Sequence, residues 1–294
     1  MRVADIVSGL GATSAERLGP LAVDLAVDGD LAPARARVRD LLGGEAVDAI
    51  VQPRAGRRKR LVVSDMDSTL IRQECIDELA AVHDLKPRVA AITERAMLGE
   101  LDFAAALVER VALLRGIPEA SIARLLDEVI TPSPGAEVLA ATCRAHGIRT
   151  VLVSGGFVQF AEPVAARLGI DVAFANRLLA ADGLLTGAVA EPILGADAKR
   201  ERLLAECAAL GISPEDAVAI GDGANDLAMI GAAGLGIAYR AKPAVAEAAD
   251  AAIRHTDLTA ILYALGIPAS SFASPPSEQA EAHGEHEGAG CGER

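Results

Sequence analysis

The chain has 294 residues, of which 51% are hydrophobic and 23% charged, so it can build a sizeable core in about two domains and is not globally disordered. Aromatic residues make up only 2% and Trp is absent, so the core must be aliphatic. With 28 basic and 41 acidic residues the net charge is −13, which argues against a nucleic-acid partner and against an anionic membrane surface.

The sequence also argues against insertion or export. No uninterrupted apolar run reaches the roughly 18 residues of a spanning helix. Asp5 and Ser8 fall where an export signal would be apolar. The four cysteines are far apart and form no C-x-x-C pair, which favours free thiols in a reducing cytoplasm; they are Cys75, Cys143, Cys207 and Cys291.

Residues 1–58 form a small N-terminal region of open role, in which 31–53 predicts a helix followed by a short strand. The basic run 57–60 is interpreted as a solvated linker rather than a nucleic-acid tag, in keeping with the acidic chain. Residues 269–294 are rich in Ser, Pro, Gly and Glu and are predicted to be a disordered tail. His283, His286 and Cys291 in this tail could bind a metal, but a disordered tail that happens to contain them is the better interpretation.

Residues 59–268 show the pattern of an α/β domain. Short apolar runs ending at Ser, Gly or Asp predict buried parallel strands at 61–65, 150–154, 217–222 and 235–239. Helical patterns at 198–211 and 244–255 alternate with these strands. The turn signal Asp182-Gly183 predicts a hairpin within 174–191. We therefore expect a Rossmann-like core with a mostly parallel sheet and helices on both faces.

Residues 74–131 have helical spacing throughout and follow the first core strand. An all-helical insertion at this point would lie above the carboxyl ends of the strands, where ligands bind in open parallel sheets. We therefore expect a helical cap that covers the site.

Four polar motifs fall at or near strand ends. They are Asp65-Met66-Asp67-Ser68-Thr69, Ser154-Gly155-Gly156, Lys199 and the run 221–226, Gly-Asp-Gly-Ala-Asn-Asp. Each alone is weak, because paired acids, Gly turns and helix lysines are common on surfaces, and the last run lacks the terminal Glu of a calcium loop. Their shared position and order make a phosphate and metal site the better interpretation.

These motifs resemble those of haloacid dehalogenase-type phosphotransferases. Within that superfamily, 65–80, 93–116 and 221–243 are similar to the bacterial phosphoserine phosphatase family, and the resemblance covers about 61–267. Members often carry an N-terminal regulatory, ACT-like domain, for which residues 1–58 are short. The resemblance implies Mg²⁺-dependent hydrolysis of O-phospho-L-serine through an aspartyl-phosphate, the last step of serine biosynthesis. The alternative kept open is a superfamily phosphatase or phosphotransferase for another small phosphate ester.

The resemblance also assigns roles to individual residues. Asp65 is the expected nucleophile, and Asp67 the general acid and base, protonated at rest if neighbouring negative charge raises its pKa. Magnesium is expected on Asp65, Asp222 and the backbone carbonyl of Asp67, with Asp226 in support. Substrate contacts are expected from Glu74 for the ammonium, Arg110 for the carboxylate, and Ser154, Gly155, Lys199 and Asn225 around the phosphate.

Three alternatives stay open beside these roles. Glu74 and Arg110 could be an ordinary helix-start acid and a surface arginine. Met97 and Phe103 could line the pocket or simply pack. The chain could be a non-catalytic phosphate sensor, which phosphoserine binding without turnover would reveal. A small-molecule substrate is the expected partner, and the oligomeric state, a homodimer among the options, is left open.

Overall fold

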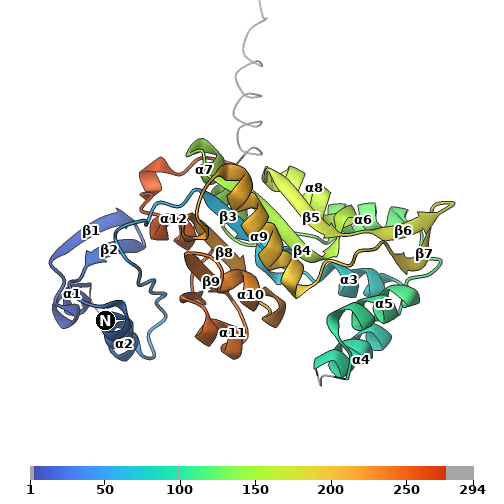
Figure 1. Cartoon of the computed structure of the whole chain (residues 1–294), viewed down its shortest axis with the longest axis horizontal. Coiled ribbons are helices and arrows are strands. Elements are labelled where there is room, and N and C mark those ends of the chain that lie inside the picture. The colour runs from blue at the N-terminus through green and yellow to red at the C-terminus, as the bar shows by residue number, and fades with distance from the viewer. Residues whose placement is uncertain (1–2, 98–99, 276–294) are drawn as a thin grey trace, which may run out of the picture.

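A six-stranded parallel sheet forms the centre of the molecule in the computed structural model, which describes residues 3–97 and 100–275 (Figure 1). The strand order is β10-β9-β8-β3-β4-β5, with β3 near the middle. The bounds are β3 (Leu61–Ser64), β4 (Arg149–Phe157), β5 (Val172–Asn176), β8 (Ala217–Gly221), β9 (Leu235–Tyr239) and β10 (Ala251–Ile253). All four predicted strands are confirmed.

Helices cover both faces of this sheet because successive strand residues point to opposite sides. Leu61 and Val63 belong to the core under α9 (Ala196–Leu210), α10 (Leu227–Ile230) and α11 (Pro243–Ala248). Val62 belongs to the larger core under α7 (Ala136–Ala145), α8 (Val158–Leu168) and α12 (Ala260–Ala264). The predicted fold class, a parallel sheet between two helical layers, is confirmed.

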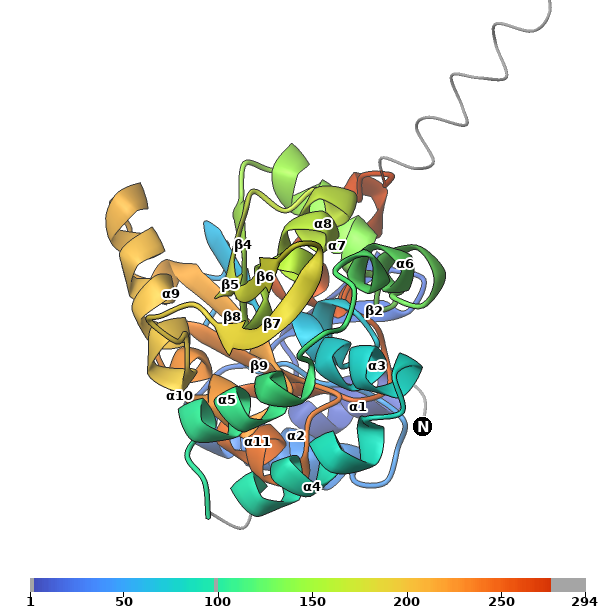
Figure 2. The same ribbon diagram turned by 90° about the vertical axis from the view of Figure 1, so that its right-hand side faces the viewer.

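The insertion between β3 and β4 is helical, as predicted. It contains α3 (Cys75–Val82), α4 (Lys86–Met97), α5 (Phe103–Leu113) and α6 (Ala120–Glu128), and no strand occurs among its described residues. Its entry and exit segments pair at Ile71 and Pro132. Figure 2 shows these cap helices in front of the sheet.

The predicted hairpin is present as β6 (Leu178–Ala181) and β7 (Leu184–Val189). Asp182 and Gly183 both have positive φ, 52° and 76°, as a tight primed hairpin turn requires. The hairpin holds the cap through backbone hydrogen bonds: the Gly116 N–H donates to the Leu185 carbonyl, and the Leu185 N–H to the Ile117 carbonyl, both at 2.8 Å. This attachment positions α5 over the site.

The N-terminal region lies at the opposite end of the molecule from α4 and α5 (Figure 1). It contains α1 (Val3–Leu10), β1 (Ser14–Gly19), β2 (Ala22–Ala26) and α2 (Leu31–Leu42), and β1 and β2 pair antiparallel. The helix expected within 31–53 is confirmed, but the prediction of a strand after it is wrong, because residues 43–53 form no strand. Asp48 instead accepts backbone hydrogen bonds from the loop 254–256, and Arg35 donates to the Val51 carbonyl. Side-chain contacts rather than strand pairing thus hold this segment in place.

Two further boundaries differ from the sequence-based expectation. The helix expected over 244–255 ends at Ala248, and Ala251–Ile253 forms strand β10 beside β9. The predicted disorder is wrong for 269–275, because Phe272 packs on Tyr263 with ring centroids 5.1 Å apart and the Ala273 N–H donates to Thr142 Oγ1. The remainder of the predicted tail, 276–294 with His283, His286 and Cys291, lies outside the described residues. Of the helices described, none combines the length and hydropathy that a membrane span requires.

Candidate active site

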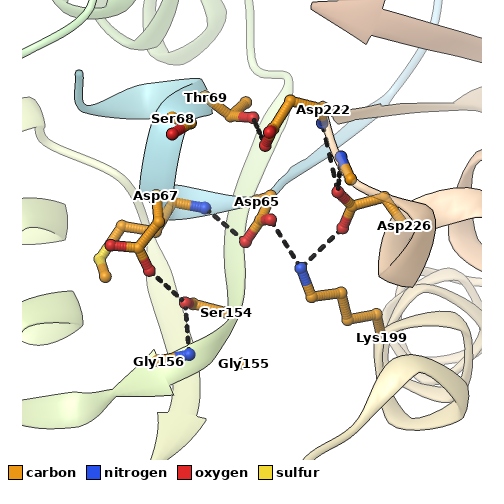
Figure 3. Close-up of polar contacts among 12 residues, drawn as sticks. Asp65, Asp67, Ser68, Thr69, Ser154, Gly155, Gly156, Lys199, Asp222 and Asp226 are labelled. Carbon is orange, nitrogen blue, oxygen red and sulfur yellow. Dashed lines mark hydrogen bonds and ion pairs between the residues drawn. The ribbon is translucent and has the colours of Figure 1, made fainter. Parts of the chain in front are cut away.

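Asp65 lies where β3 ends, at the carboxyl edge of the sheet (Figure 3). Its N–H donates to the Ile220 carbonyl of β8 at 2.9 Å, which continues the strand pairing by one residue. Its carboxyl group accepts a hydrogen bond from the Met66 N–H at 2.7 Å and lies 2.8 Å from Lys199 Nζ. These contacts fix the Asp65 carboxyl group at the end of the strand.

Three carboxyl groups converge at this edge. Oxygens of Asp65, Asp222 and Asp226 all lie within 4.8 Å of one another. Asp226, which is fully buried, accepts an ion-pair hydrogen bond from Lys199 at 2.6 Å and backbone hydrogen bonds from Asp222 and Gly223. Lys199 comes from the first turn of α9 and is only 1% exposed, so the ammonium is held between two acids.

The charges at this edge do not balance. Burial raises the pKa of Asp65, and the Lys199 ammonium opposes that rise; burial and then Asp226 raise the pKa of Asp222. Burial disfavours the Lys199 ammonium, but Asp65 and Asp226 outweigh it and raise its pKa. One ammonium thus faces three clustered carboxyl groups. These hard oxygen donors and the excess negative charge fit Mg²⁺.

Asp67 and Ser154 form the second half of the site. Asp67 accepts hydrogen bonds from the Cys75 N–H at 2.9 Å and from Ser154 Oγ at 3.2 Å, and Ser154 Oγ accepts one from the Gly156 N–H at 2.8 Å. Burial raises the pKa of Asp67, which its hydrogen bonds with Cys75 and Ser154 partly offset. The raised pKa was expected, but its main cause is loss of hydration rather than neighbouring negative charge.

The cap contributes three side chains to this edge. Phe103, at the start of α5, lies so close to Gly155 that a Cβ there would be 2.9 Å from its ring. Glu74 accepts a hydrogen bond from Ser68 Oγ at 2.6 Å. Arg110 Nε donates to the Ala106 carbonyl at 3.3 Å. Burial lowers the pKa of the Arg110 guanidinium, and the charges of Asp77 and Glu74 oppose that change. The side chain of Met97, the other candidate pocket residue, lies outside what the structure describes.

The structure brings the predicted phosphate and metal residues to one edge. Ser154, Gly155, Lys199 and Asp222 lie there with Asp65 and Asp67 (Figure 3). Asn225, in the one-turn helix Ala224–Asp226, makes no side-chain hydrogen bond with any described residue. Sequence reasoning included Thr69 in the first motif but gave it no role; its buried hydroxyl donates to Asp222 at 3.0 Å. The sequence feature that could have indicated this role is the position of Thr69 four residues after Asp65, in the turn that follows the strand.

Gly221 shows how tightly this edge is packed, since a Cβ there would overlap the Asp226 carboxyl group. We expect Gly221→Ala to displace Asp226 from Lys199, to destabilise the fold by about 1–3 kcal/mol as overpacking does, and to lower turnover at least about tenfold. Thermal unfolding and initial rates check this. Gly43→Ala is the control, because a Cβ there meets neighbours at an ordinary 3.4 Å. Equal effects of the two substitutions would contradict this account.

Comparisons with known proteins agree with this fold. The family model of haloacid dehalogenase-like hydrolases matches residues 62–231. A phosphoserine phosphatase of Albidiferax ferrireducens is 46% identical over 69% of this chain and 88% of its own length. Phosphoserine phosphatase SerB2 of Mycobacterium tuberculosis is 44% identical over 81% of this chain, but the match spans only 59% of that relative.

A solved phosphoserine phosphatase, described as a phospho-aspartyl intermediate analogue, is 42% identical and superposes with a TM-score of 0.65 over 70% of this chain and 98% of its own. The chain therefore belongs to the haloacid dehalogenase-like hydrolases. Within that family the relatives described here are phosphoserine phosphatases, which confirms the resemblance drawn from the motifs.

Proposed function

We propose that this chain is a Mg²⁺-dependent phosphatase that releases L-serine and phosphate from O-phospho-L-serine. The observation that carries the proposal is the edge where carboxyl oxygens of Asp65, Asp222 and Asp226 lie within 4.8 Å of one another and Lys199 pairs with Asp65 and Asp226. The phosphoserine phosphatase relatives support the same substrate.

Asp65 acts as the nucleophile in this proposal. Its carboxylate oxygen forms a bond to phosphorus while the bond to the serine oxygen breaks, which gives an aspartyl-phosphate. Asp67, whose pKa burial raises, donates the proton to the departing serine oxygen. The resulting carboxylate then takes a proton from the water that hydrolyses the aspartyl-phosphate and frees Asp65.

The remaining residues hold charge in place. Ser154, the Gly155 N–H, Lys199 and Asn225 bind the phosphoryl oxygens. Asp65, Asp222 and the Asp67 carbonyl would hold Mg²⁺, which when bound shields the carboxylate from the phosphate dianion. Asp226 fixes Lys199, and Thr69 fixes Asp222.

Glu74 and Arg110 are proposed to select phosphoserine. Glu74 lies at the start of α3, and the Arg110 guanidinium on α5 is within electrostatic reach of it. A carboxylate and a guanidinium complement the ammonium and carboxylate of the substrate.

The test is phosphate release from a panel of small phosphate esters, each with Mg²⁺ and with a chelator. Phosphoserine should be the best substrate, ahead of phosphoethanolamine, which lacks the carboxylate, and phosphoglycolate, which lacks the ammonium. Activity should disappear with the chelator. Equal rates across the panel would contradict the specificity, and tight binding of phosphoserine without turnover would favour a sensor.

Glu74 predicts a pH dependence. Burial, and after it the negative charge of Asp67, raises the pKa of Glu74 to about 7. An acid with a raised pKa is ionised only above that value, so its pairing with the ammonium is lost as pH falls through 7. The ratio of kcat/KM for phosphoserine to kcat/KM for phosphoglycolate should fall about tenfold from pH 8 to pH 6. The ratio should be flat in Glu74→Gln, and a flat ratio in the unsubstituted enzyme would contradict the role of Glu74.

The proposal extends to cellular setting and organisation. A cytoplasmic location is supported by the free, buried thiols of Cys75, Cys143 and Cys207. Residues 1–58 are proposed as a separate small region beside the catalytic domain 59–268, and homodimer assembly stays a prediction.

A further inference from the structure

The basic run 57–60 is not the uniformly solvated linker that the sequence suggested. Lys59 is 6% exposed and donates to the Glu215 carbonyl at 2.7 Å. Arg57 is half-buried and donates to the Tyr263 and Ala264 carbonyls at the end of α12, and it also pairs with Asp24 of β2. These two side chains fasten the run to the catalytic domain.

The outward-facing arginines of the same segment surround a cavity. Arg54 and Arg58 are exposed, and neither side chain makes a hydrogen bond or ion pair with any residue of 3–97 or 100–275. Gly56, at φ +69°, turns the chain between them. The cavity is a surface hollow of about 430 Å³ that is open to solvent, and it is lined by Arg54, Gly56, Arg57, Arg58, Leu265 and Gly266.

The charge of this cavity differs in sign from that of the chain. Asp24 neutralises Arg57, and the α12 carbonyls are already bonded, so two uncompensated guanidinium groups remain in a chain of net charge −13. Arg57, held by these contacts, also lines the cavity beside the two exposed arginines. Guanidinium forks match phosphate oxygens in geometry and charge.

We propose that this cavity binds a small anion with two or more phosphate groups through Arg54 and Arg58. Two guanidiniums on either side of a turn suit two anionic groups better than one, and the hollow has room for a small anion. The acidity of the whole chain disfavours nucleic acid as the occupant. The site is distinct from the catalytic edge and does not depend on the proposed function.

The test is calorimetric titration of pyrophosphate into the full chain with divalent cations chelated. Arg54→Gln/Arg58→Gln should weaken the binding at this site at least tenfold and leave kcat and KM for phosphoserine unchanged. Arg39→Gln/Arg88→Gln is the matched control, because it removes the same charge from two exposed arginines that do not line the cavity. Any pyrophosphate in the catalytic site contributes equally to all three proteins.

Several outcomes would overturn the proposal. One is that Arg54→Gln/Arg58→Gln binds pyrophosphate with a Kd within twofold of that of the unsubstituted chain. Another is equal weakening in the control, which would show a general charge effect. A third is duplex DNA binding through Arg54 and Arg58 when pyrophosphate does not bind. Inorganic phosphate should bind at least tenfold more weakly than pyrophosphate, and equal affinities would contradict a site for two phosphate groups.

Discussion

Replacing Asp65 with asparagine should lower phosphoserine turnover by about 10⁴-fold or more, because the amide is no nucleophile and the aspartyl-phosphate cannot form. The variant should still fold, since Lys199 keeps its 2.6 Å contact with Asp226 and one buried carboxyl group is removed from a crowded cluster. Initial rates and thermal unfolding measure the two effects separately.

Asp127→Asn provides the matched control for Asp65→Asn. Asp127 is an exposed acid on α6 of the cap, so the same chemical change there should leave turnover unchanged. A folded Asp65→Asn variant with turnover within tenfold of the unsubstituted enzyme would exclude Asp65 as the nucleophile.

Replacing Lys199 with methionine should have the largest effect on stability. Lys199 is the direct cationic partner of two buried carboxyl groups, and removing it leaves both without compensation. We expect a loss of about 3–5 kcal/mol in the free energy of unfolding at neutral pH. Turnover should fall at least about 10²-fold, because the lysine also holds phosphoryl charge.

The pH dependence of Lys199→Met distinguishes this cause from simple loss of packing. Without the ammonium, the folded-state pKa of Asp65 rises further, so protonation as pH falls should recover part of the lost stability. Arg200→Met, at the exposed neighbouring position, should change stability by only about 0.5 kcal/mol or less. A destabilisation by Lys199→Met that does not change with pH would contradict the charge argument.

The fold was predictable wherever local pattern and tertiary structure agree. The aliphatic run ending at Asp65 and the Asp182-Gly183 turn both adopt the structure that their local sequence favours. The segment 244–255 was not predictable in full, because its alanines favour a helix while pairing with β9 imposes a strand on Ala251–Ile253. Asp250 marks that boundary by accepting a hydrogen bond from the Gly236 N–H.

The site was predictable to the extent that its residues follow strand ends. Asp65, Ser154 and Asp222 meet because the carboxyl ends of β3, β4 and β8 lie side by side. The partnership of Lys199 with Asp226 was not predictable, because it joins α9 to the turn after β8 through side chains 27 positions apart. The cause of the raised Asp67 pKa also required the structure, since burial is a property of the fold.

The most direct test of the account is to stop the reaction with acid during turnover of phosphoserine and to look for a phosphoryl group on the protein by mass spectrometry. Borohydride reduction then converts an aspartyl-phosphate to homoserine with release of phosphate, and peptide mass spectrometry locates the residue that carried the phosphoryl group. The account predicts one phosphoryl group on the unsubstituted enzyme, placed at Asp65, and none on Asp65→Asn. Asp67→Asn should retain it longer, because the base that activates water is missing. A phosphoryl group at another residue, or full turnover with none bound at any time, would contradict the account.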